Sequence, residues 1–185
     1  MKTLTLLLLF VLPILLTDVQ AQSFRGLDKS PLDMAYFPDN FAHDREEGDQ
    51  AIMRVIYSRP QKKNREIFGK KVAYGKVWRT GANEATEIKL YQDVSFAGKK
   101  LKKGVYALFT IPGKNEWTII FNKGLDYWGA YRYNEGNDAL RVTAKASTSS
   151  GTTEAFTIQF EMESEGKGVM NIAWDNTVVK VPFTY

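Results

Sequence analysis

The chain has 185 residues, of which 44% are hydrophobic and 25% are charged, and its formal net charge is +4 at neutral pH. It contains no cysteine and one histidine, which excludes thiol catalysis, thiolate metal sites and metal sites built from several histidines. The positive charge is spread over lysine pairs beside predicted turns, so we do not expect nucleic acid as a partner.

The first residues have the pattern of a secretory signal peptide. Met1-Lys2 is followed by an apolar run from Leu4 to Leu16 and by a small residue at Ala21. The alternative is a membrane anchor, but the run is shorter than the ~20 residues that span a bilayer and Pro13 interrupts it. We therefore expect residues 1–21 to be a cleaved signal peptide, and the mature chain to be secreted or periplasmic without a transmembrane segment.

Residues 22–50 are predicted to form an extended arm, and residues 51–185 a single domain. The arm is rich in Asp, Pro, Asn and Gly and shows no regular apolar period. Its apolar side chains are expected to hold it against the domain: Leu32, Met34, Tyr36 and Phe37. The single histidine, His43, lies in this polar stretch, and we interpret it as solvated rather than as a general base or metal ligand.

The remainder is predicted to consist of short strands joined by turns. β-Branched and aromatic residues predict a strand over residues 51–58, and apolar–polar alternation predicts strands over residues 86–91, 140–144 and 156–162. Further strands are expected over residues 76–79, 94–96, 99–101, 104–112, 117–121, 169–174 and 178–183. Between them we expect a helical turn ended by Gly69, a hairpin at Ala97-Gly98, a linker over residues 147–153 and a turn over residues 175–177.

Roughly nine to eleven short strands with no amphipathic helix are typical of an all-β fold. We predict a single-domain antiparallel β-sandwich, of jelly-roll or immunoglobulin-like type, with at most one or two short helical turns. No internal repeat and no second domain are visible in the sequence.

The stretch from Tyr74 to Thr86 is the main candidate for a site. It combines aromatic, cationic, amide and carboxylate side chains around two glycines. It contains no histidine, phosphate loop or nucleophile elbow, so no reaction and no cofactor is indicated by motif.

Several sequence motifs resemble those of a known family. They are Tyr57-Ser58-Arg59-Pro60, Arg65-Glu66-Ile67-Phe68-Gly69, the whole of residues 74–86, Gly104-Val105-Tyr106, Phe109-Thr110-Ile111-Pro112 and Trp128-Gly129-Ala130-Tyr131. In these motifs the chain resembles the secreted bacterial domain-of-unknown-function 2911 family, of the Bacteroidota type. The resemblance implies an exported, single-domain, β-rich protein and no established activity.

Six residues are candidate ligand contacts: Arg59, Arg79, Asn83, Glu84, Trp128 and Tyr131. The arginines, with Arg65, offer planar forks that suit carboxylate, sulfate or phosphate groups, or that pair with carboxylates of the chain itself. Asn83 and Glu84 can hydrogen-bond sugar hydroxyls or a peptide backbone, although Asn83 can equally tie up loop groups.

Trp128 and Tyr131 lie in a predicted loop, which makes them better candidates for a stacking platform than the tryptophans in predicted strands.

Three functions follow from these residues. The first is an exported, non-catalytic binding module for a small polar ligand, glycan or peptide, with residues 79–86 and 128–131 meeting at one end of the sandwich. The second is a structural or envelope-associated protein, in which Arg79, Asn83 and Glu84 form a buried network without a cavity. The third is a hydrolase such as a glycosidase, with Glu84 paired with Asp126 or Asp175. We favour the first.

Overall fold

The computed structural model describes residues 23–185, so the predicted signal peptide over residues 1–21 lies outside the described residues. The strands are β1 (Leu32–Phe37), β2 (Met53–Ser58), β3 (Thr86–Leu90), β4 (Val94–Phe96), β5 (Lys99–Leu101), β6 (Gly104–Ile111), β7 (Glu116–Asn122), β8 (Asp138–Ser164) and β9 (Lys167–Thr184). Helical structure in this part of the chain is limited to one turn of α-helix, α1 (Phe41–Asp44), and one 3₁₀ turn, η1 (Glu135–Asn137). Neither helix is long and apolar enough to cross a membrane.

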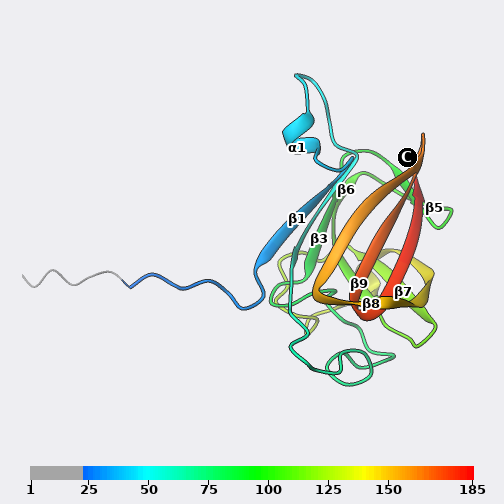
Figure 1. Ribbon diagram of the computed structural model, residues 1–185. Helices are drawn as coiled ribbons and strands as arrows, with labels where there is room; N and C mark the ends of the chain where they lie inside the picture. Colours follow the sequence, from blue (N-terminus) through cyan, green and yellow to red (C-terminus); the bar gives the residue numbers. More distant parts are fainter. Residues whose placement is uncertain (1–22) are drawn as a thin grey trace, which may run out of the picture.

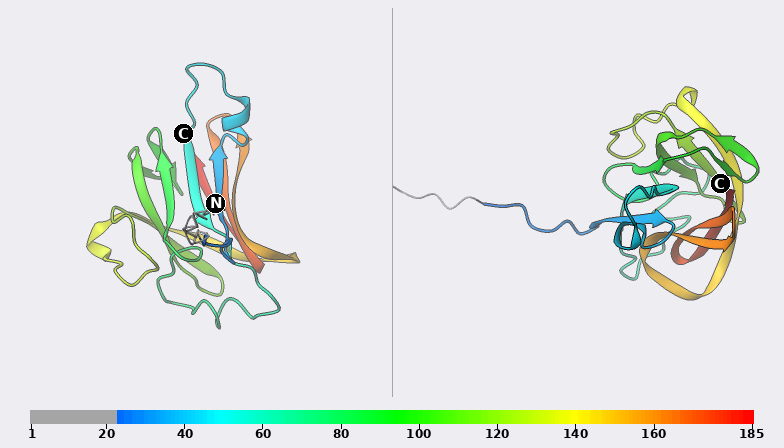
Figure 2. Two further views of the ribbon diagram at one scale, coloured as in Figure 1. Left: turned by 90° about the vertical axis from the view of Figure 1, so that its left-hand side faces the viewer. Right: turned by 90° about the horizontal axis from the view of Figure 1, so that it is seen from above.

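The nine strands form one antiparallel sheet in the order β1-β2-β3-β6-β7-β8-β9-β4-β5. The sheet curls around a common interior (Figures 1 and 2), and both of its edge strands, β1 and β5, lie near β8. The long strand β8 joins the two halves, because its first part pairs with β7 and its second part with β9. The predicted all-β antiparallel fold is therefore confirmed, as one sheet whose two halves are continuous through β8.

One hydrophobic core fills the space between the two halves. The alternation predicted for β3 is confirmed, since Ile88 and Leu90 are buried. In β8, Phe156, Ile158 and Phe160 are buried in the same way. The hairpin of β4 and β5 also forms as predicted, with Ala97 and Gly98 both at positive φ, as a tight two-residue turn requires.

The predicted linker over residues 147–153 and the predicted turn over residues 175–177 are wrong. Both stretches continue as strand, and they pair with each other across an irregular register in which Thr148 faces Thr177 and Thr153 faces Asp175. Asp175 has a φ of 56°, and the register shifts on either side of its partner Thr153, between Thr148 and Thr153 and between Thr153 and Thr157, place the extra residues in β8. The two long strands bend together because each supplies the hydrogen-bonding partner of the other.

Part of the predicted arm belongs to the sheet. Strand β1 pairs with β2 along its whole length, from Leu32 opposite Ser58 to Phe37 opposite Met53. Phe37 is buried against Phe183, with ring centroids 4.9 Å apart. Leu32 and Met34 do not hold the arm down: they are exposed, because the two-residue period of a strand turns them to the face opposite Phe37.

The segment between β2 and β3 forms a long loop at the end of the molecule opposite α1 (Figure 1). The predicted helical turn before Gly69 is absent, because Lys63 and Asn64 have positive φ and cannot continue a right-handed turn. The predicted strand over residues 76–79 is reduced to a single bridge between Trp78 and Thr110. Thr80, with a φ of 53°, then turns the chain away from the sheet.

Candidate functional site

The two loops singled out in the sequence lie side by side. The Asn83 carbonyl accepts a hydrogen bond from the Gly129 amide at 2.9 Å, and the Ala85 amide donates to the Tyr127 carbonyl at 2.8 Å. Between these bonds, Glu84 and Trp128 form an isolated antiparallel bridge. The arrangement needs left-handed backbone at Asn83 (φ 57°) and at Gly129 (φ 75°), conformations that Asn and Gly adopt most readily.

The first loop, residues 79–85, is anchored to the core from behind. The Trp78 indole donates to the Gly81 carbonyl at 3.1 Å, and the Thr86 hydroxyl donates to the Thr80 carbonyl at 2.6 Å. Trp78 also stacks on Trp174, with centroids 6.0 Å apart. These contacts hold the backbone that presents Arg79 and Asn83.

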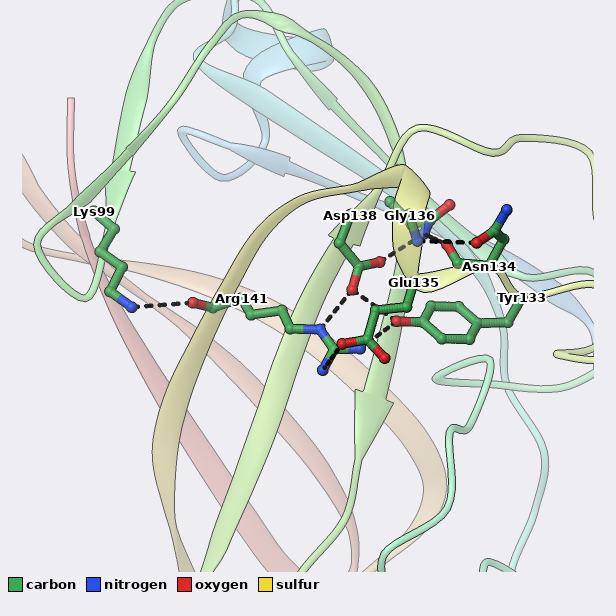
Figure 3. Close-up of polar contacts among 8 residues, drawn as sticks. Lys99, Tyr133, Asn134, Glu135, Gly136, Asp138 and Arg141 are labelled. Atoms are coloured by element: carbon green, nitrogen blue, oxygen red, sulfur yellow. Dashed lines mark hydrogen bonds and ion pairs between the residues drawn. The ribbon is translucent and has the colours of Figure 1, made fainter.

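The second loop, residues 123–137, is held by a polar cluster that the sequence did not indicate (Figure 3). The Tyr133 hydroxyl donates to the Asp138 carboxylate at 2.7 Å, and the Arg141 guanidinium donates to the same carboxylate at 2.5 Å. Arg141 also pairs with Glu135 at 3.2 Å. Burial of the phenol, together with its hydrogen bond to Asp138, raises the pKa of Tyr133 to about 12.

This cluster positions the loop, because Tyr133 lies five residues after Trp128 and packs edge-on against Phe109 of β6, with centroids 5.1 Å apart. The loop also covers Ala107, Phe109 and Ile120, which form a small second core on the outer face of the sheet. Trp128 and Tyr131 therefore project from a fixed base.

Arg79, Trp128 and Tyr131 come together on the surface. The rings of Trp128 and Tyr131 are nearly parallel, at 7°, with centroids 6.0 Å apart, although the side chains are 59% and 82% exposed. The Arg79 guanidinium carbon lies 5.3 Å from the centre of the Trp128 ring. This is the geometry of a cation–π contact beside a stacking surface.

The Arg79 guanidinium is only partly satisfied. Its Nε atom is buried and has no hydrogen-bond partner. Desolvation lowers the pKa of Arg79 below its ordinary value, while Tyr131 and Glu84 act in the opposite direction. No hydrogen bond joins Arg79, Asn83 and Glu84 to one another among residues 23–185, and Glu84 is exposed. The buried network expected of a purely structural role is therefore not formed.

Two cavities flank this group of residues. The larger, of about 940 Å³, is lined by Glu84 and Trp128, and the smaller, of about 590 Å³, by Arg79 and Tyr131. Asn83 lines both. Its side-chain amide donates to Asp28 at 3.0 Å, which holds the N-terminal segment along the larger cavity. Five of the six predicted contacts are thus brought to one region, divided between two adjoining hollows.

Arg59 lies elsewhere, and each of its three guanidinium nitrogens donates a hydrogen bond within the chain. Its guanidinium donates to the Asp33 carboxylate and to the Thr157 hydroxyl, both at 2.8 Å, and to the Phe156 carbonyl at 3.0 Å. It lines neither cavity. Arg59 therefore ties β1 to β8 across the closing edge of the sheet, which is the pairing alternative expected for a surface arginine.

Only one of the two carboxylate pairs proposed for hydrolysis lines a common cavity. Glu84 and Asp126 line the same larger cavity, whereas Asp175 lies outside it and pairs with Lys62 at 3.7 Å. His43 lies in α1, exposed and in contact with Asp44, and it lines neither cavity. Within the described chain, no three Asp, Glu or His side chains are grouped as metal ligands.

The sequence reasoning missed some residues of the smaller cavity. Lys71 lines it but reads in the sequence as one of the lysine pairs beside turns. Arg65 is predicted only as one of the arginines that suit an oxyanion, and it lines the cavity from the stretch before Gly69 for which a helical turn is predicted. Only the path of the 59–85 loop shows that these two cations approach Arg79.

Comparisons with curated proteins and with solved structures found no match. A family model does match, over residues 40–183, and its description is Protein of unknown function (DUF2911). The matched region contains strands β2 to β8, β9 except for its last residue, and both loops of the candidate site. On this match the chain belongs to the DUF2911 family.

Proposed function

We propose that the protein is an exported, non-catalytic binding module for a small polar ligand, a glycan or a peptide. The ligand contacts would be Arg79, Asn83, Glu84, Trp128 and Tyr131. Export is supported by the positive start and apolar run at the N-terminus of the sequence. Arg59 leaves the set of proposed contacts, since its donors are used within the sheet.

One observation carries the proposal: a partly buried arginine with an unpartnered Nε lies against Trp128, which forms an exposed, parallel aromatic pair with Tyr131. A buried donor without a partner costs free energy, about 1–3 kcal/mol for a typical group. Two exposed aromatic faces add surface that water solvates poorly. A ligand that stacks on the rings would remove the second cost, and hydrogen bonds to the terminal amino groups of Arg79 would hold it there.

The loops suit recognition because their backbones are fixed while their side chains face solvent. The Gly129–Asn83 and Ala85–Tyr127 hydrogen bonds join the two loops, and the Tyr133–Asp138 bond joins the second loop to β8. A site held in this way loses little conformational entropy when a ligand binds.

The test is a thermal-shift screen of residues 22–185 against neutral and acidic oligosaccharides, short peptides, nucleotides and metal ions. A compound that binds only the native state must raise the melting temperature in proportion to the logarithm of its concentration. We expect a glycan or peptide to do so, and Trp128→Ala to abolish the shift. Arg45→Gln, an exposed change near α1, is the control and should leave the shift unchanged.

Two results would contradict the proposal. One is a screen in which no glycan and no peptide raises the melting temperature. The other is a ligand whose shift persists in Trp128→Ala and in Arg79→Gln. Release of hydrolysis products from a screened glycan, lost in Glu84→Gln and Asp126→Asn, would instead favour the hydrolase alternative.

A further inference from the structure

The charged side chains that line the smaller cavity are all positive. Three cationic side chains line it, Arg65, Lys71 and Arg79, and no Asp or Glu does. The larger cavity is different, since Asp28, Glu84, Glu87 and Asp126 line it together with Arg25 and Lys29. Asn83 stands at the boundary between the two.

The three cations of the smaller cavity are not neutralised by the chain. Among residues 23–185, none of them lies within 4.0 Å of a carboxylate oxygen in an ion pair. Arg65 donates to the backbone carbonyls of Gln61 and Lys62, which orient its guanidinium without cancelling its charge. Like charges that face one hollow repel one another, and the repulsion is relieved when an anion enters.

The walls of the cavity add an aromatic surface to this charge. Tyr131 brings its exposed ring to the rim, whereas Trp78 is half-buried and Trp174, which stacks on it, is buried. Aromatic faces stack on flat or apolar ring surfaces, and arginine forks bind planar or tetrahedral oxyanions in a bidentate manner. The combination suits a sugar ring that carries an oxyanion.

We infer that the smaller cavity binds the anionic group of an acidic saccharide, with the oxyanion held by Arg79, Arg65 and Lys71 and the sugar ring against Tyr131. The inference rests on the proposed function and specifies its ligand class. The oxyanion can be the carboxylate of a uronic acid or the sulfate of a sulfated sugar, since both present oxygens that a guanidinium fork can contact.

The experiment is isothermal titration of residues 22–185 with trigalacturonate, monosulfated trigalactose, neutral trigalactose and inorganic sulfate, at 50 and 300 mM NaCl. We expect at least one acidic trimer to bind about tenfold or more tightly than the neutral trimer, as a charge-assisted hydrogen bond contributes. Its affinity should fall at the higher salt concentration, because Arg65 and Lys71 are exposed and Arg79 is only partly buried. The two acidic trimers distinguish carboxylate from sulfate.

A matched pair of variants tests the position. Lys71 lines the cavity, whereas its exposed neighbour Lys70 does not. Lys71→Gln should weaken the binding of the acidic trimer several-fold and Arg79→Gln about tenfold or more, while Lys70→Gln should change it less than about twofold. The melting temperature of each variant without ligand checks that the fold is intact.

Several outcomes overturn the inference. Equal affinity for the neutral and acidic trimers, or equal effects of Lys71→Gln and Lys70→Gln, would remove the anionic specificity and leave the binding module in place. Inorganic sulfate binding as tightly as the sulfated trimer would remove the role of the sugar. If no trimer binds, the acidic saccharide is excluded, and the wider thermal-shift screen alone decides the proposed function.

Discussion

Gly129 offers a direct test of how the site is built. A Cβ atom added at this residue would lie 2.8 Å from the Tyr131 ring and 3.1 Å from Arg79 Nη1. Gly75 is a matched control, because it has nearly the same backbone angle (φ 70° against 75°) and a Cβ there would meet nothing within 4 Å. The variants Gly129→Ala and Gly75→Ala therefore share the backbone strain and differ in the contact with the site.

The expected sizes follow from these contacts. An alanine in the left-handed region costs about 1–2 kcal/mol, and both variants should lose this much free energy of unfolding. Gly129→Ala also displaces Tyr131 from Trp128, which removes an aromatic pair of about 0.5–1.5 kcal/mol, and disturbs a cation–π contact of about 0.5–1 kcal/mol. We therefore expect Gly129→Ala to be the less stable variant by about 1–2 kcal/mol.

Urea denaturation measures the difference, and near-ultraviolet circular dichroism reports the Trp128–Tyr131 stack. The stacking signal should change in Gly129→Ala and stay as in the unchanged protein in Gly75→Ala. Equal losses of stability, with an unchanged dichroism spectrum in both variants, would refute the close packing of Gly129, Tyr131 and Arg79.

Three further predictions concern the fold and its pH dependence. Phe37→Ala should lower the free energy of unfolding by about 3–5 kcal/mol in urea denaturation, because Phe37 is 1% exposed. Leu32 is 66% exposed, so Leu32→Ala should lower it by less than about 0.5 kcal/mol. Similar losses in the two variants would contradict the burial of the Phe37 side chain of β1. Hydrogen bonds from the Lys103 amide, Lys102 and Lys100 lower the pKa of Asp93, so the stability that its carboxylate contributes is lost as the pH falls below about 4. Below this pH the melting temperature should therefore fall less steeply in Asp93→Asn than in the unchanged protein. Curves of melting temperature against pH that run parallel in the two proteins would count against this contribution. The phenol of Tyr133 ionises near pH 10 in the unfolded chain but near 12 in the folded one, so the melting temperature should fall as the pH rises across this interval. The fall should be smaller in Tyr133→Phe. An equal fall in the variant and the unchanged protein would argue against the hydrogen bond from Tyr133 to Asp138.

The local pattern of the chain was sufficient to predict most strands. Alternating apolar residues predicted β3 and the second part of β8, and the pair Ala97-Gly98 predicted the β4–β5 hairpin. These features depend on the two-residue period of a strand and on backbone angles that few residues adopt, and both are properties of neighbouring residues. The same is true of Asn83 and Gly129 in the loops.

Long-range pairing decided what these local rules left open. Residues 147–153 and 175–177 have turn-like compositions, yet both continue as strand, and they are held opposite each other by the pairs Thr148–Thr177 and Thr153–Asp175. Leu32 and Phe37 are both apolar, but the register of β1 against β2 buries only Phe37. Residue type alone does not distinguish these cases, since burial and pairing depend on segments far apart in the chain.

The candidate site shows the same division. The sequence by itself marked the two loops and their aromatic and cationic residues, because binding residues are found disproportionately on loops that a rigid scaffold positions. It did not separate Arg59 from Arg79, which differ only in their surroundings: the donors of Arg59 are met by Asp33, Phe156 and Thr157, whereas Arg79 Nε has no partner. Tertiary structure decided which arginine keeps a buried donor without a partner, because the hydrogen bonds of a guanidinium depend on groups up to 98 residues away in the sequence.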